Sequence, residues 1–202
     1  MSKADRTRQR IIERSADLFN QKGFAGTSMS DIMAATGLTK GAIYGHFNGK
    51  EAIAVAAFDY AVFTVLDELR NRIAAAPTAP AKLDAVLDYY RAYVFAPPVA
   101  GGCPILNTAV EADDSMPALR KRVALTLDML HASLTKILRT GIAREQIRAD
   151  VDVEQFATLF IALVEGAIMM ARISGDIAPM DTVVERLRGM IAEELLPESL
   201  AV

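Results

Sequence analysis

The sequence contains few of the residues from which disulfide frameworks and metal sites are built. Its 202 residues include one cysteine, Cys103, and two histidines, His46 and His131. A single cysteine excludes an intramolecular disulfide, and this small set of sulfur and imidazole ligands makes a metal cluster unfavourable. We therefore expect neither a structural metal nor a cofactor.

The sequence also has no secretory leader and no long uninterrupted apolar run. Its first ten residues are charged, and no apolar stretch of secretory type follows them. The longest apolar run, 156–171, contains Glu165 and is shorter than the roughly 20 residues that a membrane-spanning helix needs. These two observations predict a cytoplasmic protein.

Motifs of common enzymes are missing as well. The sequence contains no GxSxG, no GxGxxG and no metal-ligand spacing. Cys103 and His131 are a thiol and an imidazole that could form a dyad, but nothing in the sequence brings them together. A nucleophile, a base and a stabilising group are all needed for such catalysis. We therefore predict that the protein is not an enzyme.

Charge is distributed unevenly along the chain. The formal net charge is −3, which by itself argues against binding to nucleic acid. Residues 1–50, however, carry eight Lys and Arg against four acids, whereas the remaining residues carry 14 against 21. A basic N-terminal part on an acidic body is typical of a phosphate-binding module joined to a domain that does not bind DNA.

Helical periodicity runs through nearly the whole sequence, which predicts an all-α fold. The first helix is expected over 5–22, with Gly23 as its stop. Ser28 and Asp31 have the spacing of a capping box and open a short helix that ends at Gly37. A third short helix follows Thr39 and reaches about residue 47. Asn48 is expected to cap a long fourth helix that ends near residue 76.

The rest of the chain is expected to form about five more helices. They are predicted over about 82–95, 104–112, 115–141 and 152–174, with a last one that starts near Pro179 and ends at Pro197. We predict a three-helix domain in residues 1–50 and a larger helical bundle in 51–202.

Two short helices joined by a turn that contains Gly37 are typical of a helix-turn-helix, whose second helix enters the major groove. Four apolar residues are spaced to bury together: Ile32, Ala35, Leu38 and Ile43. The polar residues of the second helix are left to face outward. Lys40 suits bases or phosphates, and Tyr44 and His46 suit phosphate oxygens. Gly41 allows the backbone to approach the duplex, and Lys50 adds a phosphate contact near a helix N-terminus.

The segment Thr39–Glu51, TKGAIYGHFNGKE, resembles the signature of the tetracycline-repressor (TetR) family of regulators. The preceding Gly23-Phe24, Thr27, Ile32 and Gly37-Leu38 have the spacing of that family. The family's DNA-contacting positions correspond here to Thr27, Ser28, Lys40, Gly41, Ala42, Tyr44, His46 and Lys50. Two residues depart from the pattern: Met33 replaces a small alanine, and Gly45 replaces a larger side chain that often contacts DNA.

The resemblance implies how such a protein works. It implies a homodimer built on the last two helices and a ligand pocket in the C-terminal domain. It also implies a palindromic operator that is released when an inducer binds. The inducer would be a small molecule or an electrophile or oxidant. The alternative is a helical metabolite-binding protein that does not bind DNA.

The segment 156–170 is apolar almost all round, so its helix must be covered on more than one side. Ala162, Gly166 and Ala167 would allow a partner helix to approach closely. The helix that begins near Pro179 is expected to pack beside it. The sequence alone leaves open whether the cover is a second subunit or the rest of a monomeric bundle.

An effector pocket is expected in the C-terminal domain, where each candidate residue could equally belong to the core. The candidates are Phe63, Leu66, Tyr89, Tyr93, Cys103, Leu127, His131, Glu165 and Met169. His131 and Glu165 are the polar ones that could orient a ligand. Cys103 lies at the predicted start of a helix, where the pKa of a thiol is lowered, so it could sense electrophiles. The tendency of free cysteine to be buried favours the alternative, a small residue that packs under the helix over 115–141.

Overall fold

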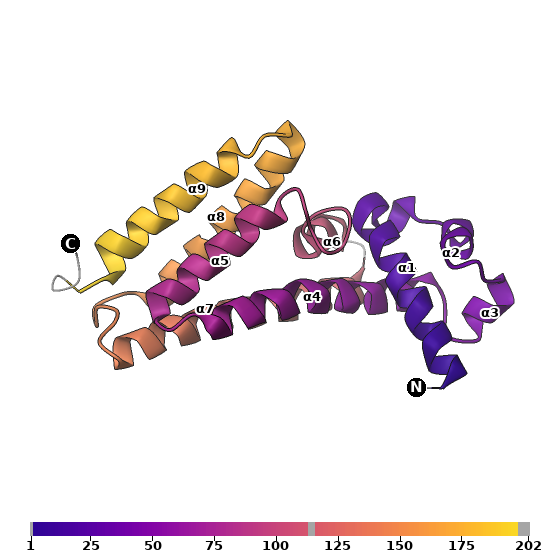
Figure 1. Cartoon of the computed structure of the whole chain (residues 1–202). Coiled ribbons are helices and arrows are strands. Elements are labelled where there is room, and N and C mark those ends of the chain that lie inside the picture. Colours follow the sequence, from indigo (N-terminus) through magenta and orange to yellow (C-terminus); the bar gives the residue numbers. More distant parts are fainter. Residues whose placement is uncertain (1, 113–115, 198–202) are drawn as a thin grey trace. The chain divides into compact units, whose positions relative to one another are not determined.

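The computed structural model describes residues 2–112 and 116–197, and this part of the chain is helical and contains no strand (Figure 1). The predicted all-α fold class is therefore confirmed. The helices are α1 (Lys3–Gly26), α2 (Met29–Thr36), α3 (Lys40–Tyr44), α4 (Lys50–Ala75), α5 (Ala79–Tyr93), α6 (Pro104–Ala112), α7 (Pro117–Ala143), α8 (Val153–Ser174) and α9 (Ala178–Met190). A turn of π-helix, Ile191–Leu195, follows α9. The predicted start of α7 at Ser115 lies outside the described residues.

Local signals in the sequence account for most helix ends. Gly23 interrupts α1 with a φ of 73°, and Gly37 ends α2 in the left-handed conformation. Asp152 caps α8 through the backbone N–H of Gln155. The structure corrects three boundaries. Helix α3 ends at Tyr44, before the predicted residue 47, and α4 begins at Lys50, one residue too late for the predicted Asn48 cap. Helix α5 begins at Ala79 because Thr78 accepts a hydrogen bond from the Ala81 N–H.

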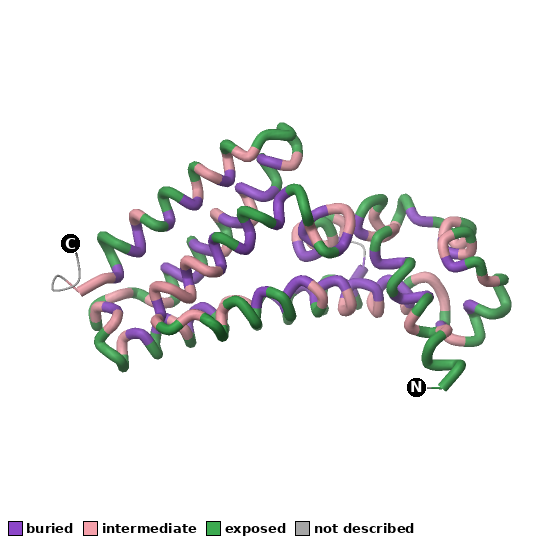
Figure 2. The backbone as a smooth tube through the Cα atoms, in the orientation of Figure 1, coloured by how far each residue is buried: buried purple, intermediate pink, exposed green. Residues whose placement is uncertain are grey.

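The chain forms two compact units, and α4 and α7 contribute residues to both. The first unit comprises the described residues of 1–65 and 97–126. Its helix-turn-helix part is held by one apolar cluster, made of Ile11, Ile12, Ile32, Ile43, Phe47 and Ile53. These side chains come from α1, α2, α3, the segment that follows α3 and the start of α4, so burial fixes the angle between α2 and α3. Figure 2 shows the resulting pattern, with buried and exposed positions alternating along each helix.

The second unit comprises the described residues of 66–96 and 127–202. Helices α5, α8 and α9 lie side by side in it (Figure 1) and enclose fully buried residues such as Leu87, Phe160 and Leu187. At the surface Arg188 pairs with Asp84 and Asp88 on α5, at 2.6 and 2.8 Å. Exposed ion pairs of this kind contribute little, so apolar burial stabilises the unit.

Helix α8 is longer than the apolar run that marks it in the sequence. It has 22 residues and an 18-residue window of mean hydropathy 1.8, so by length and composition alone it could cross a membrane. This differs from the expectation based on residues 156–171. Its contacts are those of a core helix, since α5 and α9 pack against it and Phe160, Ala167 and Ile168 are buried.

Candidate nucleic-acid interface

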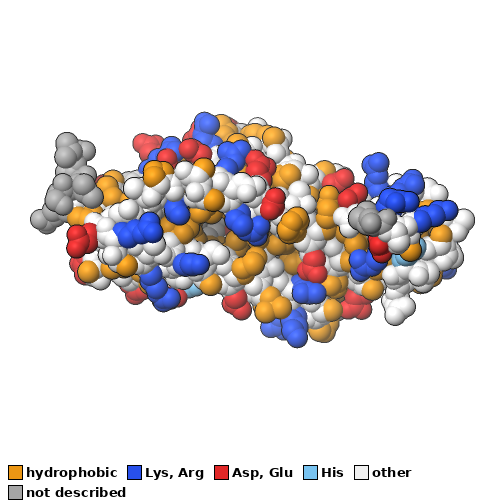
Figure 3. Space-filling model, turned by 60° about the horizontal axis from the view of Figure 1, so that its bottom comes forward, with side chains coloured by type: hydrophobic (Ala, Val, Ile, Leu, Met, Phe, Trp, Pro, Cys, Tyr) orange, Lys and Arg blue, Asp and Glu red, His pale blue; other side chains and the backbone are white. Residues whose placement is uncertain are grey.

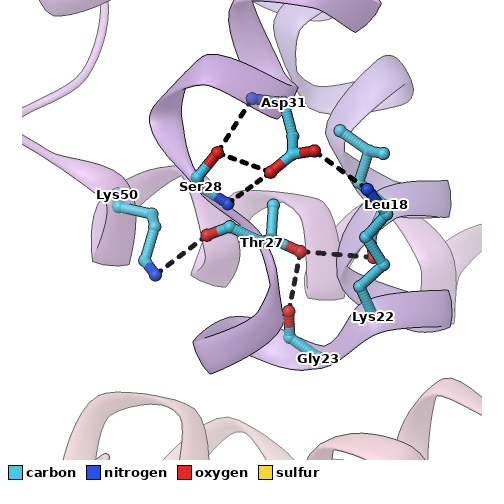
Figure 4. A network of polar contacts seen from close by, with 7 residues as sticks. All are labelled: Leu18, Lys22, Gly23, Thr27, Ser28, Asp31 and Lys50. Atoms are coloured by element: carbon cyan, nitrogen blue, oxygen red, sulfur yellow. Dashed lines mark hydrogen bonds and ion pairs between the residues drawn. The ribbon is translucent and has the colours of Figure 1, made fainter.

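The N-terminus of α2 is fixed by a reciprocal capping box. The Ser28 hydroxyl accepts a hydrogen bond from the Asp31 N–H at 3.1 Å, and the Asp31 carboxylate accepts one from the Ser28 N–H at 2.8 Å (Figure 4). Lys22 on α1 pairs with the same carboxylate at 2.9 Å. Hydrogen bonds from Ser28 and then from Lys22 hold the pKa of Asp31 well below its ordinary value. The cap is therefore complete at neutral pH and is lost as acid protonates this carboxylate.

This cap gives a prediction for stability. Ser28→Ala removes the acceptor for the Asp31 N–H and is expected to lower the free energy of unfolding by about 1 kcal/mol. Urea denaturation followed by circular dichroism measures the change. Ser28→Asp supplies another acceptor and should restore most of the loss. An unchanged midpoint in Ser28→Ala would show that the cap does not stabilise the motif.

Helix α3 presents one buried and several exposed side chains. Thr39 caps it by accepting a hydrogen bond from the Ala42 N–H at 3.3 Å, and Ile43 is fully buried in the apolar cluster. The opposite face is exposed and carries Lys40, Gly41, Ala42 and Tyr44, four of the predicted DNA-contacting residues. A Cβ added at Gly41 would meet no atom within 4 Å, so this face is open to a close approach. The Lys40 ammonium lies 5.8 Å from the centre of the Tyr44 ring.

Two other predicted DNA contacts have their side chains engaged inside the protein. Thr27 is fully buried, and its hydroxyl donates to the carbonyl of Gly23 at 2.7 Å. The Lys50 ammonium donates to the Thr27 carbonyl at 3.0 Å (Figure 4). It also donates to the Phe24 carbonyl at 2.7 Å and lies 3.9 Å from the centre of the Phe24 ring. Lys50 therefore ties the start of α4 to the corner between α1 and α2. A contact between either side chain and DNA stays a prediction.

The two remaining predicted residues are Ser28 at the start of α2 and His46 just after α3. Ser28 is exposed beside Thr27, and His46 is half-buried. Basic side chains of α1 add to the positive charge, and one of them, Arg8, stacks over the Phe47 ring at 4.8 Å. Figure 3 shows Lys and Arg side chains gathered over the part of the first unit that carries the helix-turn-helix. The departures from the family pattern fit the fold, since Met33 packs half-buried against the apolar cluster.

A second polar network joins α1 to α6 within the first unit, and the sequence analysis missed it. The Asn20 amide donates to the carbonyls of Ala100 and Gly102, at 3.0 and 2.8 Å. The Asn107 amide on α6 donates in turn to the Asn20 backbone carbonyl at 3.0 Å. The Glu111 carboxylate accepts the N–H groups that follow the break at Gly23. Partners 80 or more residues apart leave no local spacing to detect.

The predicted effector residues are scattered over both units. Phe63, Leu127 and Met169 are exposed, whereas Tyr89 and Tyr93 are buried in a cluster with Tyr90. His131 lies 3.2 Å from the Thr158 hydroxyl, so it joins α7 to α8. Leu66 and Glu165 line two cavities of the second unit. Their role, like that of the others, stays a prediction.

Cys103 is buried, with 5% of its surface exposed. Its carbonyl accepts a hydrogen bond from the Asn107 N–H at 3.1 Å, so it occupies the N-cap position of α6. Its burial agrees with the interpretation of Cys103 as a packed core residue. Its N-cap position agrees with the interpretation of Cys103 as a sensor of electrophiles. Burial restricts access to the thiol.

Both parts of the chain match known family models. Residues 11–57 match the model described as bacterial regulatory proteins, tetR family. Residues 79–187 match the model described as tetracyclin repressor-like, C-terminal domain. Together they cover the helix-turn-helix and most of the second unit.

Individual relatives agree with these models. A crystal structure of a TetR transcriptional regulator from Chloroflexus aurantiacus is 44% identical, with a TM-score of 0.93, over 97% of this chain and 99% of that one. The HTH-type transcriptional repressor DhaR of a Mycobacterium species is 25% identical over 95% of this chain and 93% of its own. CifR, solved as a cysteine mutant with 26-base-pair operator DNA, is 21% identical over 90% of this chain and 94% of its own. Its TM-score of 0.80 shows the common fold.

Proposed function

The chain belongs to the TetR family of DNA-binding transcriptional regulators, and from this premise we propose that it is a homodimeric repressor which an inducer releases from a palindromic operator. The repressor named DhaR and the operator complex of CifR support this proposal. We also propose that this regulator acts in the cytoplasm and carries out no catalysis. Oxidant sensing and a protein without DNA binding remain the alternatives that the experiments below separate.

The observation that carries the proposal is the exposed face of α3. Ile43 anchors the helix in the core, and Lys40, Gly41, Ala42 and Tyr44 are left free of the protein interior. A helix with this orientation can enter the major groove, where Lys40 reaches base edges or phosphates and the Tyr44 hydroxyl reaches a phosphate. Gly41 and Ala42 are small enough to let the helix backbone lie close to the bases.

A stripe of small and apolar residues on α8, all exposed except the half-buried Gly166, supports a homodimer. Leu159, Ala162, Gly166, Met169 and Ile173 follow one another at intervals of three or four residues, which places them on one side of the helix. Leu159 and Met169 are almost half exposed, and Ile173 is 87% exposed. An apolar helix face of this length is unfavourable in water. A second copy of α8 packed against it would bury the stripe.

Electrophile sensing by Cys103 is the less favoured form of induction, because the thiol is buried. We expect the Cys103 thiol of the folded protein to react with a disulfide reagent at least about tenfold more slowly than it does in urea. The absorbance of the released thiolate measures both rates. Equal rates, together with operator release that disappears in Cys103→Ser, would favour the sensor instead.

One titration tests the function. A fluorescent duplex that carries the intergenic region next to the protein's own gene is titrated with the protein at two salt concentrations, and anisotropy is recorded. A scrambled duplex is the control. Specific binding that weakens steeply with salt is expected, because a helix-turn-helix dimer displaces counterions from several phosphates. Equal binding to both duplexes, or none, would contradict the proposal for this operator and favour a protein that binds only metabolites.

A further inference from the structure

The second unit contains a cavity whose charged lining residues are all positive. It has a volume of about 360 Å³ and lies between the end of α4, the start of α5 and the second half of α7. Four cationic residues line it: Arg70, Lys82, Lys136 and Arg144. No Asp or Glu is among its described lining residues. The lining also includes the apolar residues Leu69, Ile73 and Ile137.

Three of these four cations have no acidic partner among the described residues. Arg70 pairs with Asp67 on its own helix, at 3.2 Å and exposed to solvent. Within residues 2–112 and 116–197, Lys82, Lys136 and Arg144 form no ion pair. Ala79, the first residue of the 15-residue helix α5, also lines the cavity, so the positive end of a helix dipole adds to the field. An anion is therefore the complementary ligand.

A second, apolar cavity adjoins the first. Its volume is about 60 Å³, and Leu69, Ile73, Leu130, Ser133 and Ile137 line both cavities. Beyond this shared wall the inner cavity is surrounded by apolar side chains such as Val86, Leu134 and Phe160. Glu165 is its one described charged residue. Cations around the outer cavity and apolar walls around the inner one match a molecule with a charged head and a hydrocarbon tail.

We propose that this site binds an amphipathic anion, with its carboxylate or a similar acidic head among Lys82, Lys136 and Arg144 and its apolar chain directed along the shared wall. The role of this ligand as the inducer rests on the proposed repressor function. Its chemical class rests on the lining alone.

Binding is tested with the whole chain and without DNA. The fluorescent fatty acid cis-parinarate gains emission in an apolar site, and the absence of tryptophan from the sequence removes a competing signal. Dodecanoate, dodecanol and dodecyltrimethylammonium, all below their micelle concentrations, then compete for the site. Dodecanoate is expected to displace the probe at a concentration at least about tenfold lower than dodecanol does, and the cation is expected to be weakest.

Two variants test the contributions of the charge and of the cavity separately. Lys136→Gln with Arg144→Gln should weaken dodecanoate binding about tenfold or more and leave dodecanol binding unchanged. Arg120→Gln with Lys121→Gln removes two exposed cations of α7 that do not line the cavity and serves as the matched control. Ser133→Phe fills the wall shared by the two cavities and should abolish binding of all probes. Circular dichroism and thermal unfolding establish that each variant is folded.

Three results would overturn the proposal: no binding of parinarate, dodecanol binding as tightly as dodecanoate, or unchanged dodecanoate binding in the Lys136→Gln, Arg144→Gln variant. Operator release is measured separately by anisotropy. If dodecanoate binds with the expected charge dependence but leaves the operator complex intact, the ligand class stands and the inducer role fails. If the protein binds no operator at all, the repressor function fails while the binding result still decides the ligand class.

Discussion

A Lys40→Ala, Tyr44→Ala double variant is expected to bind the operator at least about 100-fold more weakly than the parent protein. Both side chains lie on the exposed face of α3 and neither contributes to the apolar cluster, so the fold should be unaffected. A good contact to a base edge contributes about 1–3 kcal/mol, and a dimer loses every contact twice. Anisotropy titrations against the operator and against a scrambled duplex measure both affinity and specificity.

The salt dependence of this variant tells the two roles of Lys40 apart. If Lys40 neutralises a phosphate, the slope of log affinity against log salt should become shallower by about 0.9 for each copy, while specificity is retained. If it reads a base, the variant should lose discrimination between duplexes with a smaller change in slope. Lys121→Ala, which removes an exposed cation of the same unit, is the matched control. Operator affinity within threefold of the parent would reject α3 as the recognition helix.

Lys50 illustrates what the sequence could and could not predict about this interface. The Ser28 cap, the stop at Gly37 and the start of a helix after Thr39 were predicted, because their signals lie within four residues of the helix ends that they make. The same local view placed Lys50 near a helix N-terminus and assigned it to phosphate. Its actual partners, the carbonyls of Phe24 and Thr27, lie 26 and 23 residues away. Only the folded corner brings them together.

Which residues line the cavities of the second unit is hard to predict from sequence for a similar reason. Helix α5 carries Tyr89, Tyr90 and Tyr93, and all three are buried, but it is Tyr90 that lines the inner cavity. Successive residues differ by about 100° around a helix, so a wrong rotation replaces one tyrosine with its neighbour. In a helix that is apolar on several sides the hydrophobic pattern does not fix this rotation. Phe63 was expected inside for the same reason, and 60% of its surface is exposed.

Gly166→Glu is expected to convert the protein into a monomer while leaving the isolated subunit as stable as before or slightly more stable. A Cβ at Gly166 would meet no atom within 4 Å in its own chain, so the substitution causes no clash within the subunit. Glycine in a helix interior is also about 1 kcal/mol less favourable than a good helix former, which glutamate is. In the proposed dimer the same side chain would insert a charge into a closely packed apolar contact.

Gly166→Glu should thus weaken dimerisation without weakening the subunit, so loss of the dimer cannot be attributed to unfolding. Sedimentation equilibrium should give a dimer for the parent protein and a monomer for Gly166→Glu. The circular dichroism spectrum of the monomer should show no loss of helix. Leu125→Glu places the same charge on an exposed apolar residue outside the α8 stripe and should leave the dimer intact. Because a palindromic operator is bound by two linked copies of α3, the monomeric variant should also lose most of its operator affinity although its recognition helix is unchanged. If Gly166→Glu remains a dimer with full operator affinity, α8 does not form the interface, and its apolar stripe needs another partner.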